Sequence, residues 1–369
     1  MKKQKILITG SLGFVGSHLA KRYHNLGHTV IGVDSGIGGY NDNLTECVTH
    51  KIDCCDVNRL NQLFQQNKFD LVIHSACTPY EGLSVVSPVL VTRNTYDATV
   101  CVLRCSIEHK VKRFVYMSSM ARYGNQKPPF TETMQTRPED PYGIAKVASE
   151  ETVKCLCDLN NIEWSIVVPH NIYGPNQVYN DPYRNVVSIF LNRQLQNKPA
   201  IIYGDGNQKR CLSYIDDTLR IFDKICFDSS AKSEVFNIGP DEDYITITEL
   251  ADTCANITGY NGKHEYEPPR PKEVKYATCS SDKIRKYFNY KTQIDLKTGI
   301  KNTMNYIIKK GVKSFKYNFE IEINNEKTPI TKPKKYACCK ICRKGQACGN
   351  SCISRRYTCR KPRGCACNK

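Results

Sequence analysis

Residues 5–16, KILITGSLGFVG, contain the part of the sequence that decides the fold. The apolar run at 6–9 predicts a buried strand, and the apolar spacing that follows, through Leu19 and Tyr23, predicts a helix. Between the two lie three glycines: Gly10, Gly13 and Gly16. Residues without a Cβ allow a tight turn and a close approach of the backbone to a phosphate group, which the free N–H groups of the helix start can bind.

The same strand-to-helix order continues along the first half of the chain. Apolar runs predict strands at 29–33, 71–74, 114–117 and 164–168, and helical spacing predicts helices at 57–66, 88–109 and 142–160. Near-continuous apolar strands separated by helices are typical of a parallel sheet that is covered on both faces. We therefore expect an α/β fold, with a Rossmann-like doubly wound parallel sheet over residues 1–168.

After residue 168 the sequence changes to turns rich in Pro, Gly and Asn, with shorter apolar runs between them. Helical spacing near 247–258 and 296–310 predicts the longer helices of a smaller mixed α/β lobe. We assign this lobe to residues 169–331 and expect it to bind mainly the substrate. Residues 332–369 form a third part, a basic Cys-rich C-terminal tail.

The positive charge of the chain is concentrated in the tail. Of 53 Lys and Arg residues, 12 lie in residues 332–369, which contain 8 of the 20 Cys and no Asp or Glu. The first 331 residues therefore carry 41 Lys and Arg against 36 Asp and Glu, a net charge of +5 out of +17. Because the apolar run at 6–9 is too short for a signal peptide or a membrane span, we expect a cytoplasmic protein without a membrane contact.

The tail leaves several interpretations open. It has too little apolar material for a core of its own, so it is ordered by disulfides or stays disordered. Cys339 and Cys342 have the spacing of a zinc knuckle, which makes zinc a second alternative and other metal chemistry a third. The basic residues suit nucleic acid or another anionic surface, although a solvated tail is the simpler interpretation.

Chemically useful side chains follow the predicted strands. Asp34 comes 18 residues after Gly16, where its carboxylate can bind the ribose of NAD and would repel the 2′-phosphate of NADP. Tyr142 and Lys146 are four residues apart and so share one helix face, where the cation lowers the pKa of the phenol and suits it to act as a general base. Ser119, after the strand at 114–117, can bring a hydroxyl to the same point.

Four motifs together resemble the extended short-chain dehydrogenase/reductases. In chain order they are Thr9-Gly10-x-x-Gly13-Phe14-x-Gly16, Ser118-Ser119 with Tyr123-Gly124, Tyr142-x-x-x-Lys146, and Pro169-His170-Asn171-Ile172-Tyr173-Gly174-Pro175. The resemblance covers about residues 4–315. It is to the NAD-dependent nucleotide-sugar epimerase/dehydratase family, and within that family most of all to the UDP-sugar 4-epimerases.

The resemblance implies a tightly held NAD that is regenerated in each turnover. The residues that would contact it are Gly10, Gly13, Phe14, Val15, Gly16, Asp34, Asp56, Val57, Ser75, Ala76, Asn94, Ser118, Tyr142 and Lys146. Tyr142 would take the proton of the sugar 4-hydroxyl, Ser119 would share that hydrogen bond, and Lys146 would favour the phenolate. The implied reaction inverts C4 of UDP-glucose/UDP-galactose, or of the N-acetylated pair, through a transient 4-keto sugar.

For the UDP-sugar, the resemblance implies contacts from Ser119, Asn171, Arg184, Arg210 and Arg270. Guanidinium groups suit a diphosphate because they can donate two parallel hydrogen bonds. Ala277 stands where a bulky aromatic side chain restricts some family members to unacetylated sugars, so a small residue here would admit an N-acetyl group. The family also implies a homodimer formed by the helices that start near Pro88 and Tyr142.

Two other functions stay open. The 4,6-dehydratases of the family need an Asp-Glu pair directly after the Ser/Thr hydroxyl, whereas Met120 and Ala121 follow Ser119 here. This absence makes a 4,6-dehydratase the less favoured function, and a dehydratase or a decarboxylase is kept as the alternative within the family. An alternative of another class is a NAD-binding scaffold whose basic tail binds nucleic acid or another anion, although the complete catalytic set argues against it. His74, on a predicted buried strand, is expected to be a core histidine.

Overall fold

The computed structural model describes residues 2–44, 46–240, 244–269, 276–316, 322, 340–342, 346–348, 351–354, 356 and 366–368. By its contacts the chain divides into two compact units, Met1–Ile323 and Asn324–Lys369. This division falls a few residues before the change in composition at residue 331. The further division of the first unit into a cofactor domain and a substrate lobe stays a prediction.

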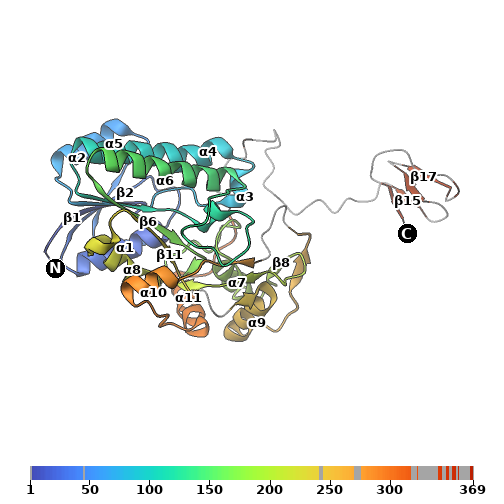
Figure 1. The fold of residues 1–369 in the computed structure, drawn as a ribbon. Helices are drawn as coiled ribbons and strands as arrows, with labels where there is room; N and C mark the ends of the chain where they lie inside the picture. Colours follow the sequence, from blue (N-terminus) through green and yellow to red (C-terminus); the bar gives the residue numbers. More distant parts are fainter. Residues whose placement is uncertain are drawn as a thin grey trace. The chain divides into compact units, whose positions relative to one another are not determined.

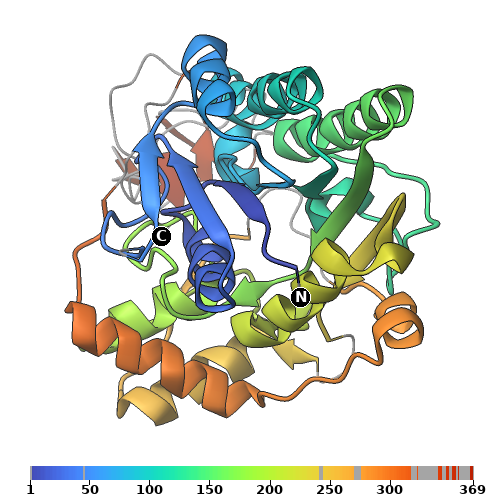
Figure 2. The same cartoon turned by 90° about the vertical axis from the view of Figure 1, so that its left-hand side faces the viewer.

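The first unit is built on a seven-stranded parallel sheet in the order β11-β6-β5-β4-β1-β2-β3. The strands are β1 (Lys5–Thr9), β2 (Thr29–Asp34), β3 (Val48–Lys51), β4 (Leu71–His74), β5 (Arg113–Met117), β6 (Glu163–Pro169) and β11 (Glu234–Ile238). Figure 2 shows the sheet between two layers of helices. The order and the parallel pairing confirm the predicted Rossmann-like doubly wound sheet.

Helices cover both faces of this sheet (Figure 1). One layer holds α2 (Val57–Gln66), α3 (Glu81–Ser84), α4 (Pro88–Thr92), α5 (Ala98–Glu108) and α6 (Pro141–Leu159), and α1 (Phe14–Asn25) and α8 (Ile215–Phe227) lie on the other face. Ile6 and Ile8 of β1 pack into the core on one side, whereas Leu7 packs into the core on the other. The sheet is thus buried on both faces, as its apolar strands require.

The helix predicted over 88–109 is interrupted in the structure. Between α4 and α5 the segment η1 (Arg93–Asp97) forms a π-helix, which adds about one residue to a turn. Short π-helical segments are frequent at functional sites. Here the segment carries Asn94, one of the residues expected to contact NAD.

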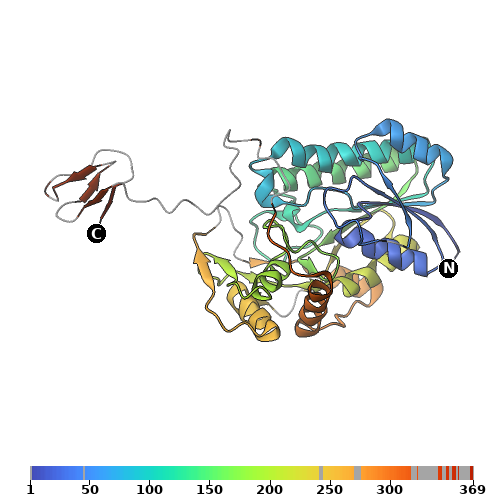
Figure 3. The ribbon, with the colours of Figure 1, turned by 180° about the vertical axis from the view of Figure 1, so that it is seen from behind.

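The smaller lobe is made of helices and short strands from the second half of the unit. Helices α7 (Val186–Gln194), α9 (Ile247–Thr258) and α11 (Leu296–Lys310) lie side by side (Figure 3), and α10 (Asp282–Phe288) packs near β11. The strands pair as β7 (Ile172–Tyr173) with β10 (Ser213–Tyr214), β8 (Ile201–Tyr203) with β13 (Glu265–Glu267), and β9 (Lys209–Arg210) with β12 (Ile245–Thr246) and β14 (Tyr276–Ala277). The helices predicted at 247–258 and 296–310 are therefore confirmed.

The second unit contains four short strands in its described residues. Strand β15 (Lys340–Cys342) pairs in parallel with β18 (Ala366–Asn368), and β16 (Gln346–Cys348) pairs antiparallel with β17 (Ser351–Ile353). Cys348 and Cys352 are disulfide-bonded, whereas core cysteines of the first unit such as Cys157 and Cys226 are free thiols.

The bonding of Cys348 and Cys352 agrees with the expectation that disulfides order the tail, whereas a zinc site at Cys339 and Cys342 stays a prediction. Cys339 lies outside the described residues, and of Cys342 only the backbone is described. Within the described part of the chain, no group of three or more His, Cys, Asp or Glu side chains is arranged to hold a metal. In the same part of the chain, no helix has the length and apolar character needed to cross a membrane.

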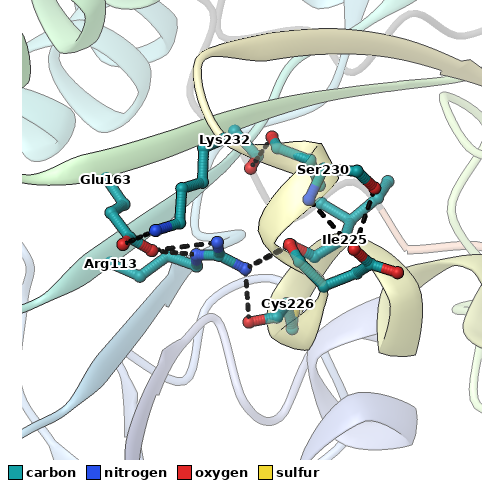
Figure 4. A network of polar contacts seen from close by, with 9 residues as sticks. Arg113, Glu163, Ile225, Cys226, Ser230 and Lys232 are labelled. Atoms are coloured by element: carbon teal, nitrogen blue, oxygen red, sulfur yellow. Dashed lines mark hydrogen bonds and ion pairs between the residues drawn. The ribbon is translucent and has the colours of Figure 1, made fainter.

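Arg113 ties helix α8 to the sheet at the edge where the strands begin (Figure 4). Its Nε and Nη2 lie 3.0 and 2.9 Å from Oε2 of Glu163, and Lys232 contacts the same carboxylate. Its Nη1 donates to the carbonyl oxygens of Ile225, Cys226 and Asp228 at 3.2, 2.9 and 3.0 Å. The last carbonyls of a helix have no partner within the helix, and Arg113 supplies one.

We expect Arg113→Met to lower the free energy of unfolding by about 2–3 kcal/mol, because it leaves the carbonyl oxygens of Ile225, Cys226 and Asp228 without their buried donor. Urea unfolding followed by circular dichroism measures the change. The matched control is Arg104→Met, whose exposed pair with Glu108 is worth about 0.5 kcal/mol or less. Equal effects of the two substitutions would contradict the assignment of α8 docking to Arg113.

Candidate active site

The glycine turn between β1 and α1 leaves no room for side chains. Gly10 has a φ of +70°, and a Cβ there would lie 3.0 Å from backbone atoms of Ala76. A Cβ on Gly16 would lie 2.1 Å from the carbonyl oxygen of Gly10. Helix α1 begins at Phe14, directly after Gly13, so the N–H groups of its first turn have no partner within the helix. The turn therefore fits a pyrophosphate, which requires close backbone approach and free N–H donors.

Asp34 ends the neighbouring strand β2 and is buried. Its Oδ2 accepts a hydrogen bond from the backbone N–H of Leu12 at 2.9 Å, and its Oδ1 accepts one from Gly36 at 2.7 Å. These bonds fix the carboxylate beside the glycine turn. Because a carboxylate has about four lone-pair positions, two remain for ribose hydroxyl groups. The position and chemistry of Asp34 thus fit the adenosine ribose of NAD.

The other residues expected to contact NAD are held by short polar contacts. Ser75 donates to the carbonyl oxygen of Thr9 at 2.6 Å, and the N–H of Ala76 donates to Oγ1 of Thr9 at 3.2 Å. Asn94 donates to Oγ1 of Thr78 at 3.0 Å.

The remaining expected NAD contacts lie at the starts of two helices. Asp56 caps helix α2 and so fixes the start of that helix at Val57. Phe14 and Val15 form the first turn of α1. The contacts of all these residues with NAD stay predictions.

Three successive residues at the end of β5 each contact helix α6. The carbonyl oxygen of Met117 accepts a hydrogen bond from Nζ of Lys146 at 2.7 Å, Ser118 donates to Glu150, and Ser119 is hydrogen-bonded to Tyr142. Residues 142, 146 and 150 follow one another at intervals of one helical turn, so they share one face of α6. The structure thereby brings together the three expected catalytic residues, Ser119, Tyr142 and Lys146.

The side chains of Tyr142 and Lys146 are both buried. Burial raises the pKa of Tyr142, while the positive charge of Lys146 and the hydrogen bond from Ser119 act in the opposite direction. Burial alone would lower the pKa of Lys146, but Cys77 and the phenols of Tyr116 and Tyr142 outweigh it and raise the pKa. Lys146 is therefore a cation at neutral pH, placed where it can stabilise a phenolate at Tyr142.

Cys77 is a site residue that the sequence did not reveal. Its thiol is hydrogen-bonded to Lys146, and its side chain packs in the same cluster as Tyr142. One cysteine among 20 carries no distinguishing mark in the sequence. The available signal was its place directly after Ser75 and Ala76, both of which were already expected at the site.

His74 is the core histidine that the sequence predicts. It has no exposed surface, and its Nδ1 and Nε2 lie 2.7 and 3.1 Å from the hydroxyls of Thr9 and Thr99. Burial lowers its pKa to about 3, so the ring is neutral at physiological pH. Both ring nitrogens are occupied by structural partners, which leaves the ring no role in proton transfer.

Three of the residues expected to bind substrate come together in the smaller lobe. Arg210 of β9 and Ala277 of β14 are register partners on neighbouring strands. Asn171, with a φ of +43°, donates to the carbonyl oxygen of Cys211, the residue after Arg210, at 3.0 Å. Arg270 lies outside the described residues. The contacts of these residues with a substrate stay predictions.

Arg184 has mainly protein partners. Its Nη2 donates to the carbonyl oxygen of Gly38 at 2.7 Å, and its guanidinium carbon lies 4.4 Å from the centre of the Tyr80 ring. The Tyr80 hydroxyl in turn donates to Asp181 at 2.6 Å. Arg184 thus connects the loop after β2 to the loop before α7. Arg184 therefore has a structural role between these two loops. The substrate contact that the sequence predicts for Arg184 stays a prediction.

Comparison with known proteins agrees with this geometry. Residues 6–239 match the model of the NAD dependent epimerase/dehydratase family. A Methanocaldococcus jannaschii protein, named provisionally as a UDP-glucose 4-epimerase, is 31% identical over 309 residues, which are 82% of this chain and 98% of that protein. A Bacillus cytotoxicus UDP-N-acetyl-alpha-D-glucosaminuronate decarboxylase is 28% identical over 320 residues, which are 82% of this chain and 98% of that enzyme.

The fold is shared with solved enzymes of the same kind. The crystal structure of Thermotoga maritima UDP-glucose 4-epimerase with UDP-glucose superposes with a TM-score of 0.78 at 29% identity, covering 83% of this chain and 99% of that chain. The family match begins at β1, which leads into the glycine turn, and ends directly after β11, so it spans the whole parallel sheet. The chain therefore belongs to the NAD dependent epimerase/dehydratase family.

Proposed function

We propose that this protein is an NAD-dependent 4-epimerase of a UDP-hexose. The observation that carries the proposal is the alignment of Ser119, Tyr142 and Lys146 by β5 and α6. These residues lie at the edge of the sheet at which the glycine turn follows β1. One protonatable phenol, one hydroxyl and one fixed cation are what reversible oxidation of a secondary alcohol needs from the protein.

In this mechanism Tyr142 is the general base. As a phenolate it takes the proton of the 4-hydroxyl, which Ser119 holds in place through a second hydrogen bond. NAD, when bound at the glycine turn, supplies the reversible two-electron oxidation of C4. Lys146, held by the carbonyl oxygen of Met117, stabilises the phenolate by its charge. Tyr142 returns the proton to the oxygen after the 4-keto sugar has turned over, so the net reaction is inversion at C4.

The residues after Ser119 favour epimerisation over dehydration. Met120 and Ala121 begin the short helix η2 (Met120–Tyr123), and neither side chain can donate or accept a proton. Elimination of water from C5 and C6 therefore lacks an acid and a base at this position. Decarboxylation needs no such pair, because a 4-keto sugar acid can lose its C6 carboxyl group as carbon dioxide, so a decarboxylase stays an alternative for a UDP-sugar acid.

The experiment that tests the proposal is incubation of the purified protein with UDP-glucose, UDP-GlcNAc and UDP-glucuronate without added NAD, followed by proton NMR. We expect a 4-epimer of at least one of them. An accumulating 4-keto-6-deoxy sugar would assign a dehydratase instead, and loss of the C6 carboxyl would assign a decarboxylase. No turnover even with added NAD would favour a NAD-binding scaffold or a substrate outside these three.

We expect Tyr142→Phe to lower kcat by about 10²- to 10⁴-fold with little change in KM, because the general base is lost and the UDP contacts remain. In the unaltered protein, burial raises the pKa of Tyr142. Below that pKa the phenolate fraction falls tenfold per pH unit, so kcat should rise with pH on the acid side. A pH profile that Tyr142→Phe leaves unchanged in shape would contradict the role of Tyr142.

We expect Gly16→Ala to abolish copurification of NAD, because the added Cβ would lie 2.1 Å from the carbonyl oxygen of Gly10. NAD released from the denatured protein and measured by chromatography gives the content per chain. Gly82→Ala in α3 is the matched control, since its Cβ meets only ordinary contacts, the nearest at 3.7 Å. The glycine turn would not be the pyrophosphate site if Gly16→Ala retained as much NAD as this control.

We expect Ala277→Tyr to lower kcat/KM for UDP-GlcNAc at least tenfold relative to UDP-glucose. Ala277 is buried beside Arg210, so a phenol there would fill the space proposed for an N-acetyl group. Parallel assays of both sugars with the variant give the ratio directly. An unchanged ratio would remove Ala277 from the residues that select the sugar.

A further inference from the structure

A buried ion pair lies directly behind the proposed catalytic residues. Nη2 of Arg122, in η2, is 3.1 Å from Oε2 of Glu150, on α6, and the two side chains are only 4% and 0% exposed. Transfer of two charges out of water costs several kcal/mol per ion, so such a pair usually adds little to stability. A gain in stability therefore does not explain why Arg122 and Glu150 are buried together at this place.

Glu150 holds the chain on both sides of Ser119. One carboxylate oxygen accepts a hydrogen bond from Ser118, directly before Ser119, and the other faces Arg122, three residues after it. Within this short span, Oγ of Ser119 accepts a hydrogen bond from the N–H of Ala121, and its carbonyl oxygen accepts one from the N–H of Arg122, both at 3.2 Å. Ser119 is thus fixed between two points that Glu150 binds.

The same carboxylate fixes this span relative to the catalytic helix. Glu150 lies one turn beyond Lys146 and two turns beyond Tyr142 on one face of α6. At the first turn of α6, a Cβ on Gly143 would lie 2.9 Å from the carbonyl oxygen of Ala121, so the helix already packs closely against η2. A shift of η2 would therefore change the distance between the hydroxyls of Ser119 and Tyr142.

The surroundings of Arg122 agree with a role in positioning. Its guanidinium carbon lies 5.1 Å from the centre of the Tyr123 ring. Among the described residues, its Nε and Nη1 have no hydrogen-bond partner. Burial raises the pKa of Glu150, which Arg122 and Ser118 oppose. An apolar side chain at position 122 would meet the packing requirement at a lower desolvation cost, so packing alone does not account for the arginine.

We propose that Arg122 and Glu150 are positioning residues that set the alignment of Ser119 with Tyr142. They act on kcat through Ser119 and touch neither the sugar nor the cofactor. The inference rests on the proposed catalytic role of Ser119 and Tyr142. It goes beyond that role because it assigns a function to two side chains that take no part in the proton transfer.

The test compares Glu150→Gln, Arg122→Met, Arg122→Lys and the double variant Arg122→Met/Glu150→Gln. The matched control is Glu151→Gln, the next residue on α6, whose exposed side chain pairs with Lys154. For each protein, kcat is expressed per bound NAD, so that misfolded protein does not enter the value. Thermal unfolding is measured alongside, and kcat and KM are determined separately.

We expect Glu150→Gln and Arg122→Met each to lower kcat 10- to 100-fold while KM changes less than twofold, and we expect Arg122→Lys to lose less kcat than Arg122→Met. The double variant should regain thermal stability, because it leaves no unpaired buried charge, but should not regain kcat. Glu151→Gln should resemble the unaltered protein. Values of kcat within twofold of the unaltered protein for both Glu150→Gln and Arg122→Met, or recovery of kcat in the double variant, would overturn the proposal.

Failure of the positioning role and failure of the proposed epimerase function would give different results. Oxidation at C4 precedes epimerisation, dehydration and decarboxylation alike, so the variants are compared on whichever product the unaltered protein forms. A crystal structure of Glu150→Gln gives a readout that needs no turnover. We expect the distance between the hydroxyls of Ser119 and Tyr142 to grow by about 0.5 Å or more. An unchanged distance would overturn the positioning role even if the epimerase function held.

Discussion

One constraint organises the site: a parallel sheet buried on both faces can present polar groups to a ligand only where its strands end. Thr9, Asp34 and His74 end β1, β2 and β4, and Ser118 and Ser119 follow β5. The central strand β1 is packed into a core on each side of the sheet, as the alternation of Ile6, Leu7 and Ile8 shows. The residues proposed for proton transfer therefore lie at the carboxyl edge of β5 and in the first two turns of α6, near the glycine turn that follows β1.

The parts of the fold that local rules control could be predicted from the sequence. Helix α9 begins at Ile247 and ends at Thr258, as predicted, because a capping box of Thr246 and Glu249 starts it and Gly259, at a φ of +76°, ends it. The glycine turn and the Tyr142–Lys146 pair are short-range patterns of the same kind. Such signals fix an element without reference to the rest of the chain.

The parts that depend on distant contacts could not be predicted. Strand β3 is a polar edge strand whose Val48 is exposed, so it lacks the apolar run that marks the central strands. Strand β11 comes from the stretch assigned to the smaller lobe, yet it returns to pair with β6. Cys77 and Arg122 stand close in the sequence to expected site residues, but their contacts with Lys146 and Glu150 come from tertiary packing, which their positions in the sequence do not show. Predictions from the sequence thus fail where long-range packing decides.

The chain contains both reduced and oxidised cysteines. Cys157 and Cys226 of the first unit are free thiols, whereas Cys348 and Cys352 of the second unit are disulfide-bonded. Burial raises the pKa of Cys157 and of Cys226 to about 12, so these core thiols carry almost no thiolate, the form that reacts with oxidants and disulfides. The tail is different, because its cysteines lie among 12 Lys and Arg residues with no acidic residue, which favours thiolate. Conditions that oxidise the tail would therefore leave these core thiols reduced.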